Sequence, residues 1–217
     1  MRNYLSNLTG KGKRLMGMLL MVSLSHCLIF LSSCSEEDET VDEYADWQQR
    51  NDAFFATLDD SLARSNVQWM KLKSFSKDET TTGAVYDYIY ARVLERGTGT
   101  ESPLYTDSVR VSYKGRLLPV ASEPDGLIFD YTYDGNFSWT TTGVRDGLVS
   151  VFVDGFTTAM LHMHRGDRWR VYIPYQLGYK SATSGSVPAY STLIFDVALV
   201  DFCHPNESLP KWNARKR

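Results

Sequence analysis

The sequence predicts an α+β fold in which one antiparallel sheet curls on a single short helix, preceded by an N-terminal helical segment. Two observations support this prediction. Short stretches with strand-like alternation follow one another after residue 85, and only one helical stretch lies among them. An apolar stripe of helical period precedes them. The expected strands are 86–94, 108–118, 127–130, 168–173 and 192–202, and the expected short helix is 154–164.

Residues 1–33 have the pattern of a lipoprotein signal peptide. Basic residues without any acidic residue precede an apolar run over 15–31, which is of signal-peptide length and too short for a confident membrane span. The run ends in Leu-Ser-Ser-Cys at 31–34, which resembles the lipobox of bacterial lipoproteins. That resemblance implies acylation of Cys34 and anchoring in a membrane. An ordinary signal peptide followed by an incidental cysteine is the alternative.

The chain that would remain after cleavage is acidic. Loss of residues 1–33 would change the formal net charge from −3 to −7, which argues against nucleic acid as a partner. The acidic run 35–39 is similar to a surface-export signal of some Gram-negative lipoproteins, so we expect an outer-membrane protein of the cell envelope, either periplasmic or surface-exposed. With Cys34 acylated, Cys203 would have no partner for an intrachain disulfide.

Residues 34–84 are predicted to form an acidic tether, a helix and a connector. Between 41 and 65 the apolar residues recur at helical spacing, with one polar interruption at Asn51. This helix could pack on the domain that follows or self-associate to give a homodimer. We expect 66–84 to be an irregular connector, 85–203 the main domain, and 204–217 a C-terminal tail. The apolar residues of the stripe are Tyr44, Trp47, Phe54, Phe55, Leu58 and Leu62.

Several motifs in the main domain resemble the FKBP-type peptidyl-prolyl cis-trans isomerases, over roughly 86–202. They are Val-Ser-Tyr-Lys-Gly-Arg-Leu at 111–117, Phe-Asp at 129–130, Val-Asp-Gly-Phe at 153–156, the run 164–174, Leu-Gly-Tyr at 177–179, and Ser-Thr-Leu-Ile-Phe-Asp-Val at 191–197. The resemblance implies a five-stranded half-barrel sheet curled around a short helix. It also implies isomerase activity on proline-containing protein or peptide clients.

The same resemblance assigns the site residue by residue. Aromatic side chains form the walls and floor of the pocket, one carboxylate stands at its edge, and a backbone N–H and a phenolic O–H bind substrate carbonyls. The catalytic set is Tyr113, Phe129 and Phe195 as walls, Phe156 as the floor, Asp130 at the edge, Val153 for its N–H and Tyr179 for its O–H. Phe137, as a further wall, Trp139 and Tyr190 are expected to contribute to substrate binding.

Other chemistries find little support. The pair His162 and His164 is two residues apart, so the two side chains would not share a helix face, and no acidic partner motif is near. No nucleophile elbow or phosphate-binding glycine loop is present. We therefore expect no metal and no cofactor. The serious alternative is a catalytically weak or inactive binding module or chaperone on the same fold.

Three departures from the family pattern lie in or beside the expected site. Many family members have tryptophan where Phe156 stands, and glycine where Lys180 stands. The segment 140–147 is expected to be an insertion at the rim of the pocket. These departures bear on catalytic strength more than on the fold.

Overall fold

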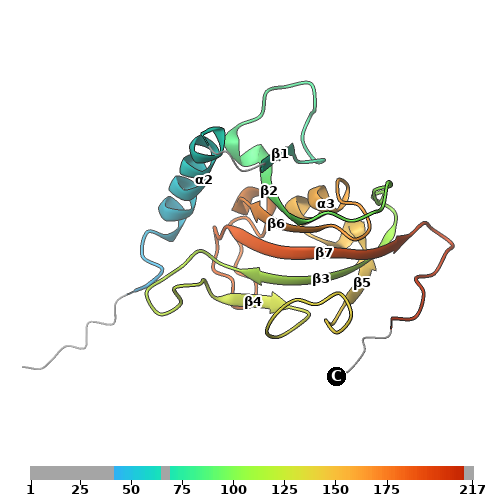
Figure 1. Cartoon of the computed structure of the whole chain (residues 1–217). Coiled ribbons are helices and arrows are strands. Elements are labelled where there is room, and N and C mark those ends of the chain that lie inside the picture. The colour runs from blue at the N-terminus through green and yellow to red at the C-terminus, as the bar shows by residue number, and fades with distance from the viewer. Residues whose placement is uncertain (1–41, 65–68, 213–217) are drawn as a thin grey trace, which may run out of the picture. The chain divides into compact units, whose positions relative to one another are not determined.

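The computed structural model describes residues 42–64 and 69–212. Its centre is a seven-stranded antiparallel sheet with the order β1-β2-β6-β7-β3-β4, and β5 pairs with β3 beside β4. Figure 1 shows β7 and β3 side by side across the molecule. The strands are β1 (Trp69–Lys73), β2 (Tyr88–Glu95), β3 (Ser108–Arg116), β4 (Ile128–Tyr131), β5 (Arg145–Leu148), β6 (Arg168–Ile173) and β7 (Leu193–Cys203).

The helices are few, as the sequence predicts. In 42–64 and 69–212 they are α2 (Trp47–Ala63) and α3 (Asp154–Met160), with three short 3₁₀ turns: η1 (Val85–Asp87), η2 (Val149–Val151) and η3 (Tyr175–Leu177). The α+β fold with a curled antiparallel sheet is confirmed. Among the described residues, no helix has the length and apolar character needed to cross a membrane.

The alternation of buried and partly exposed side chains along β6 gives the sheet an apolar face on which α3 packs. Trp169, Val171 and Ile173 are buried, while the residues between them are partly exposed. A β-carbon added at Gly155 in α3 would lie 2.3 Å from Cγ2 of Ile173. Glycine at position 155 therefore allows the helix to approach the sheet closely, which places its N-terminal end against the strands.

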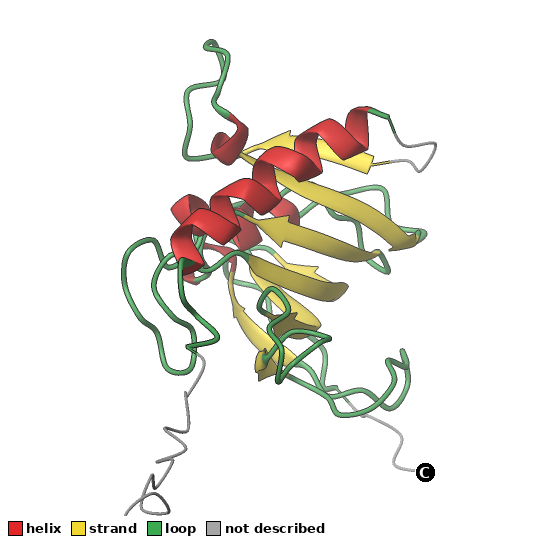
Figure 2. Ribbon diagram, turned by 90° about the vertical axis from the view of Figure 1, so that its left-hand side faces the viewer, coloured by secondary structure: helices red, strands yellow, loops and turns green. Residues whose placement is uncertain are grey.

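The N-terminal helix packs on its own domain. Figure 2 shows α2 lying across the sheet on the face opposite α3. Trp47 is buried, and its indole N–H donates to the hydroxyl of Ser191 over 2.8 Å. Asn51, the polar interruption in the stripe, is also buried, and its Oδ1 accepts the N–H of Thr192 at 2.7 Å. Packing in cis is therefore what α2 does here, and association into a homodimer stays an untested prediction.

Four expectations about the elements need correction. The helix begins at Trp47, not near 41, and α3 ends at Met160, not 164. The connector 66–84 is not wholly irregular, because β1 forms within it and pairs with β2. The sheet has seven strands where five were expected, since β1 forms in the connector and β5 forms at the end of the predicted rim insertion. Because β4 pairs only with the C-terminal part of β3, the N-terminal part is free to pair with β5.

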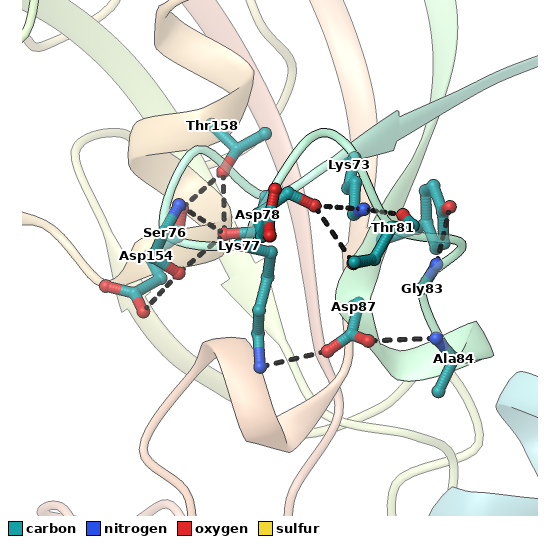
Figure 3. A network of polar contacts seen from close by, with 12 residues as sticks. Lys73, Ser76, Lys77, Asp78, Thr81, Gly83, Ala84, Asp87, Asp154 and Thr158 are labelled. Atoms are coloured by element: carbon teal, nitrogen blue, oxygen red, sulfur yellow. Dashed lines mark hydrogen bonds and ion pairs between the residues drawn. The ribbon is translucent and has the colours of Figure 1, made fainter.

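The loop between β1 and β2 is held by polar contacts that reach α3 (Figure 3). The hydroxyl of Ser76 donates to Oδ2 of Asp154, the first residue of α3, over 3.0 Å. Lys77 forms an ion pair of 2.9 Å with Asp87, and this contact is the main reason why the pKa of the Asp87 carboxyl lies below its usual value. The loop thus ties the start of α3 to the edge of the sheet.

Candidate functional site

A small cavity of about 150 Å³ opens where the N-terminal end of α3 meets β3 and β7. Its interior is mostly aromatic. The residues that line it are Tyr113, Asp130, Arg145, Val151, Phe152, Val153, Phe156, Tyr179 and Phe195. Six of the seven residues predicted as catalytic are therefore brought together from five separate parts of the chain.

Aromatic rings build the walls and floor by edge-to-face packing. Phe156 is 3 % exposed, and its ring centroid lies 5.8 Å from that of Tyr113 and 5.1 Å from that of Phe195. The seventh predicted residue, Phe129, does not line the cavity, and its ring packs against the wall residue Phe195 with centroids 5.4 Å apart at 84°. T-shaped pairs of this kind are favourable beyond the area they bury. The rings therefore hold one another in place without a ligand.

Gly115 in β3 makes room for this wall. A β-carbon at that position would lie 2.6 Å from Cε1 of Phe195 and 2.7 Å from Cζ of Phe129. Both contacts are too short for real atoms, so any larger residue would push the rings from their places. The glycine of the 111–117 motif thus has a packing reason at the site.

A polar triad stands at the edge of the cavity. The hydroxyl of Tyr113 donates to Oδ2 of Asp130 over 2.7 Å, and Nη1 of Arg145 donates to the same hydroxyl over 2.9 Å. Arg145 also lies 3.7 Å from the Asp130 carboxylate. Burial, followed by the hydrogen bond to Asp130, raises the pKa of Tyr113 to about 12, so this hydroxyl keeps its proton at neutral pH.

Two donors at the cavity remain available for a ligand. Val153 is the N-cap residue of α3 with an extended backbone, so its N–H lies outside the helical hydrogen-bond ladder. Within 42–64 and 69–212, neither this N–H nor the Tyr179 hydroxyl donates a hydrogen bond to another residue. The arrangement can therefore bind two carbonyl groups beside an apolar ring.

The position after Tyr179 shows how the chain tolerates a departure from the family pattern. Lys180 adopts φ of 60°, in the left-handed region that favours glycine. Its N–H donates to the carbonyl of Tyr175 at 2.9 Å, and its carbonyl accepts the N–H of Tyr190 at 2.8 Å. Lysine thus takes the glycine-like conformation at a cost of roughly 1–2 kcal/mol, and the loop keeps its turn.

Three residues predicted to bind substrate lie outside the cavity. Phe137 packs against Trp139, with ring centroids 4.9 Å apart, and beneath the guanidinium of Arg168 at 4.6 Å. The indole N–H of Trp139 donates to Glu95 over 2.7 Å. Tyr190 packs edge-on against Tyr175, near α2. Phe137 is thus not placed as a cavity wall, and a role for the three in substrate binding stays a prediction.

Arg145, Val151 and Phe152 line the cavity but were missed from the sequence. Phe152 packs on Phe156 with 4.7 Å between ring centroids. Because it directly precedes the predicted Val153, its place in the sequence could have identified it as a lining residue. Arg145 gave no such signal, because it reaches Tyr113 only through the pairing of β5 with β3.

The histidines of the 162–164 pair have separate partners. Nδ1 of His162 lies 2.8 Å from the carbonyl of Thr158, and Nδ1 of His164 lies 3.5 Å from the Asp167 carboxylate. Across the part of the chain that the structure describes, no group of three or more His, Cys, Asp or Glu side chains could hold a metal ion.

Comparison with known proteins shows which sequences this chain is similar to. Residues 99–200 match the family model described as FKBP-type peptidyl-prolyl cis-trans isomerase. The macrophage infectivity potentiator of Trypanosoma cruzi is 37 % identical over 108 residues, which is 49 % of each chain. The FKBP-type peptidyl-prolyl cis-trans isomerase FkpA of Escherichia coli K12 is 33 % identical over 135 residues, 59 % of this chain and 43 % of that one. The chain thus spans about half the length of these relatives or less.

Solved structures support the fold. The crystal structure of FkpA from Escherichia coli superposes with a TM-score of 0.52 at 23 % identity, and covers 91 % of this chain and 74 % of that one. A peptidyl-prolyl cis-trans isomerase from Pseudomonas syringae gives a TM-score of 0.51 at 23 % identity, over 73 % of this chain and 95 % of that one.

Proposed function

We propose that the protein is an FKBP-type peptidyl-prolyl cis-trans isomerase, whose family model residues 99–200 match, and that it catalyses cis-trans exchange of X–Pro bonds in the aromatic cavity. The observation that carries the proposal is the convergence of Tyr113, Phe156 and Phe195 beside two donors that bond to no described residue. We call this cavity the prolyl cavity.

The chemistry requires no nucleophile or proton transfer. Rotation about a peptide bond meets a barrier of about 18–20 kcal/mol because the C–N bond has double-bond character. The twisted transition state has lost that resonance and is less polar than the planar amide, so an apolar cavity stabilises it relative to water. An acceleration of roughly ten-thousand-fold needs about 5.5 kcal/mol of stronger binding to the transition state than to the ground state.

The remaining groups orient the substrate. The N–H of Val153 and the O–H of Tyr179 would each hold a carbonyl of the flanking chain, so that only the X–Pro bond rotates. The hydrogen bond from Tyr113 to Asp130 fixes the ring that forms one wall. Arg145 offsets the charge of Asp130, although both side chains are about half exposed and their mutual attraction is correspondingly weak.

Replacing Asp130 with alanine is expected to lower kcat/KM about tenfold, because a hydrogen bond to a charged group contributes about 1.5–3 kcal/mol. The Tyr113 hydroxyl would lose its acceptor, while the half-exposed position should leave the fold intact. A protease-coupled assay on an Ala-Leu-Pro-Phe peptide measures the change. Asp134→Ala is the matched control. It removes an exposed carboxylate four residues later and should leave kcat/KM unchanged.

Two outcomes would contradict this assignment. Equal activity of the Asp130 and Asp134 variants would remove Asp130 from the site. If circular dichroism shows that the Asp130→Ala variant is unfolded, the carboxylate is needed for the fold and is not specific to the site. Tyr113→Phe completes the series, because it deletes the same hydrogen bond but keeps the buried ring.

We further propose that the protein is a lipoprotein of the bacterial cell envelope, attached through Cys34, where it assists the folding of envelope or surface proteins. Cys34 lies outside the described residues, so this proposal rests on the lipobox-like sequence at 31–34 and the acidic run behind it. A lipidated cysteine would keep the prolyl cavity close to newly exported chains, in which X–Pro bonds isomerise over tens of seconds.

Cys34→Ala is expected to move the protein from the membrane fraction to the soluble fraction, because the thiol that carries the lipid is gone. Fractionation of cells followed by immunoblotting measures the shift. Cys27→Ala is the matched control and should stay with the membrane, since it removes a cysteine from the segment that precedes the expected cleavage site. Membrane retention of the Cys34 variant would place the anchor elsewhere.

A further inference from the structure

A second and larger cavity lies between α2 and the turns η1 and η3. It has a volume of about 450 Å³ and shares no lining residue with the prolyl cavity. Phe55 of α2, Tyr86 of η1 and Tyr175 of η3 supply aromatic surface. Tyr86 is 45 % exposed, although most large apolar side chains of the sheet are buried. A concave, largely apolar site of this size is typical of a binding site.

Polar atoms in the wall of this cavity have no partner. The Oε1 of Gln176 and the Oγ1 of Thr192 are buried and make no hydrogen bond with any described residue. A buried polar atom without a partner costs about 1–3 kcal/mol. Both atoms are closed to solvent where they stand, so a ligand N–H would reach the Gln176 oxygen once that side chain turns toward the cavity, and the contact would then recover part of the cost.

The only charge among the residues that line this cavity is negative. Asp52 is the charged residue among those that line the cavity, and it is exposed on α2. A second, more open groove begins at Asp52 and continues along α2 past Asp46 to Tyr190. Carboxylates beside tyrosine rings favour a cation, through ion pairing and through contact with the ring faces.

We propose that this cavity binds an arginine or lysine side chain of a polypeptide segment, independently of proline. Asp52 receives the cationic head, the rings of Tyr86 and Tyr175 cover its apolar stem, and the Gln176 amide accepts an N–H. A client chain would thereby be held at a second point while its X–Pro bonds visit the prolyl cavity. The binding itself does not require isomerase activity, so the two proposals can fail separately.

The test uses a proline-free probe. An acetylated and amidated Ala-Ala-Arg-Ala-Ala peptide is titrated into the purified ¹⁵N-labelled protein, and the same peptide with neutral citrulline in place of arginine is the matched ligand. We expect saturable shifts of the amides at Asn51, Asp52 and Gln176 with the arginine peptide. We also expect affinity about fivefold weaker with citrulline or in Asp52→Asn, the upper range for an exposed ion pair.

Asp60→Asn is the matched protein control. Asp60 lies on the same helix, pairs with Arg64 in solvent and does not line the cavity, so its removal should leave the affinity unchanged. Equal binding of the arginine and citrulline peptides, equal effects of the two asparagine variants, or shifts confined to Tyr113 and Phe195 would overturn the proposal. Displacement of the arginine peptide by an X–Pro peptide would do so as well, because it would assign the binding to the prolyl cavity.

Discussion

Replacing Phe156 with alanine should lower the free energy of unfolding by about 3–5 kcal/mol and remove most of the isomerase activity of the folded fraction. Phe156 is almost wholly buried and touches the rings of Tyr113, Phe152 and Phe195. Its loss leaves a void under the cavity and frees the walls to move. Urea unfolding gives the stability change, and the peptide assay, corrected for the folded fraction, gives the activity.

The control for this variant is Phe75→Ala. Phe75 is 38 % exposed, its ring contacts Tyr105, and neither residue lines the cavity. Its removal should cost less than about 1 kcal/mol and leave activity unchanged. Full activity per folded molecule in Phe156→Ala would contradict the account, because Phe156 would then be a core residue without a part in catalysis.

Replacing Trp47 with alanine should also cost about 3–5 kcal/mol, as expected for a buried tryptophan. The change removes the indole N–H bond to Ser191 and opens the contact by which α2 covers the sheet. Activity per folded molecule should remain, since Trp47 does not line the prolyl cavity. Chemical unfolding and the peptide assay together separate these effects.

Trp47→Phe refines the interpretation, because it keeps a large ring but deletes the donor. It should cost about 1 kcal/mol, the usual contribution of one hydrogen bond. If Trp47→Ala kept full stability but abolished a concentration-dependent dimer, the role of α2 would be self-association and not packing in cis. Sedimentation at several protein concentrations decides between the two.

The elements that were predicted well carry their own signals. β6 has strict alternation and is closed by Pro174, so its bounds 168–173 were predicted from the sequence alone. β1 and β5 have no such signal. β1 is five residues long and is a strand because β2 pairs with it, and β5 (Arg-Asp-Gly-Leu) has no apolar alternation. Pairing partners far along the chain decide such strands, and local pattern does not show them.

The site residues also fall into those that a sequence motif predicts and those that only the fold brings to the cavity. Tyr113, Asp130, Val153, Phe156 and Phe195 stand in motifs that could be recognised, and the structure brings them together. Arg145 arrives on the unpredicted β5, so its contact with Tyr113 could not be foreseen. Phe137 and Trp139 are aromatic and near in sequence, but Arg168 and Glu95 hold them away from the cavity lining. Proximity along the chain was a poor guide to which aromatic rings converge.

Exchange spectroscopy of an Ala-Leu-Pro-Phe peptide, with the protein at a small fraction of the peptide concentration, tests the central claim most directly. Without a catalyst, the cis and trans signals of the proline exchange over tens of seconds and give no cross-peaks on the timescale of the experiment. The proposal predicts cross-peaks between the two isomers that grow with protein concentration and weaken in Phe156→Ala. Peptide signals that shift or broaden through binding, but show no cis-trans cross-peaks, would contradict catalysis and identify a binding module on the same fold.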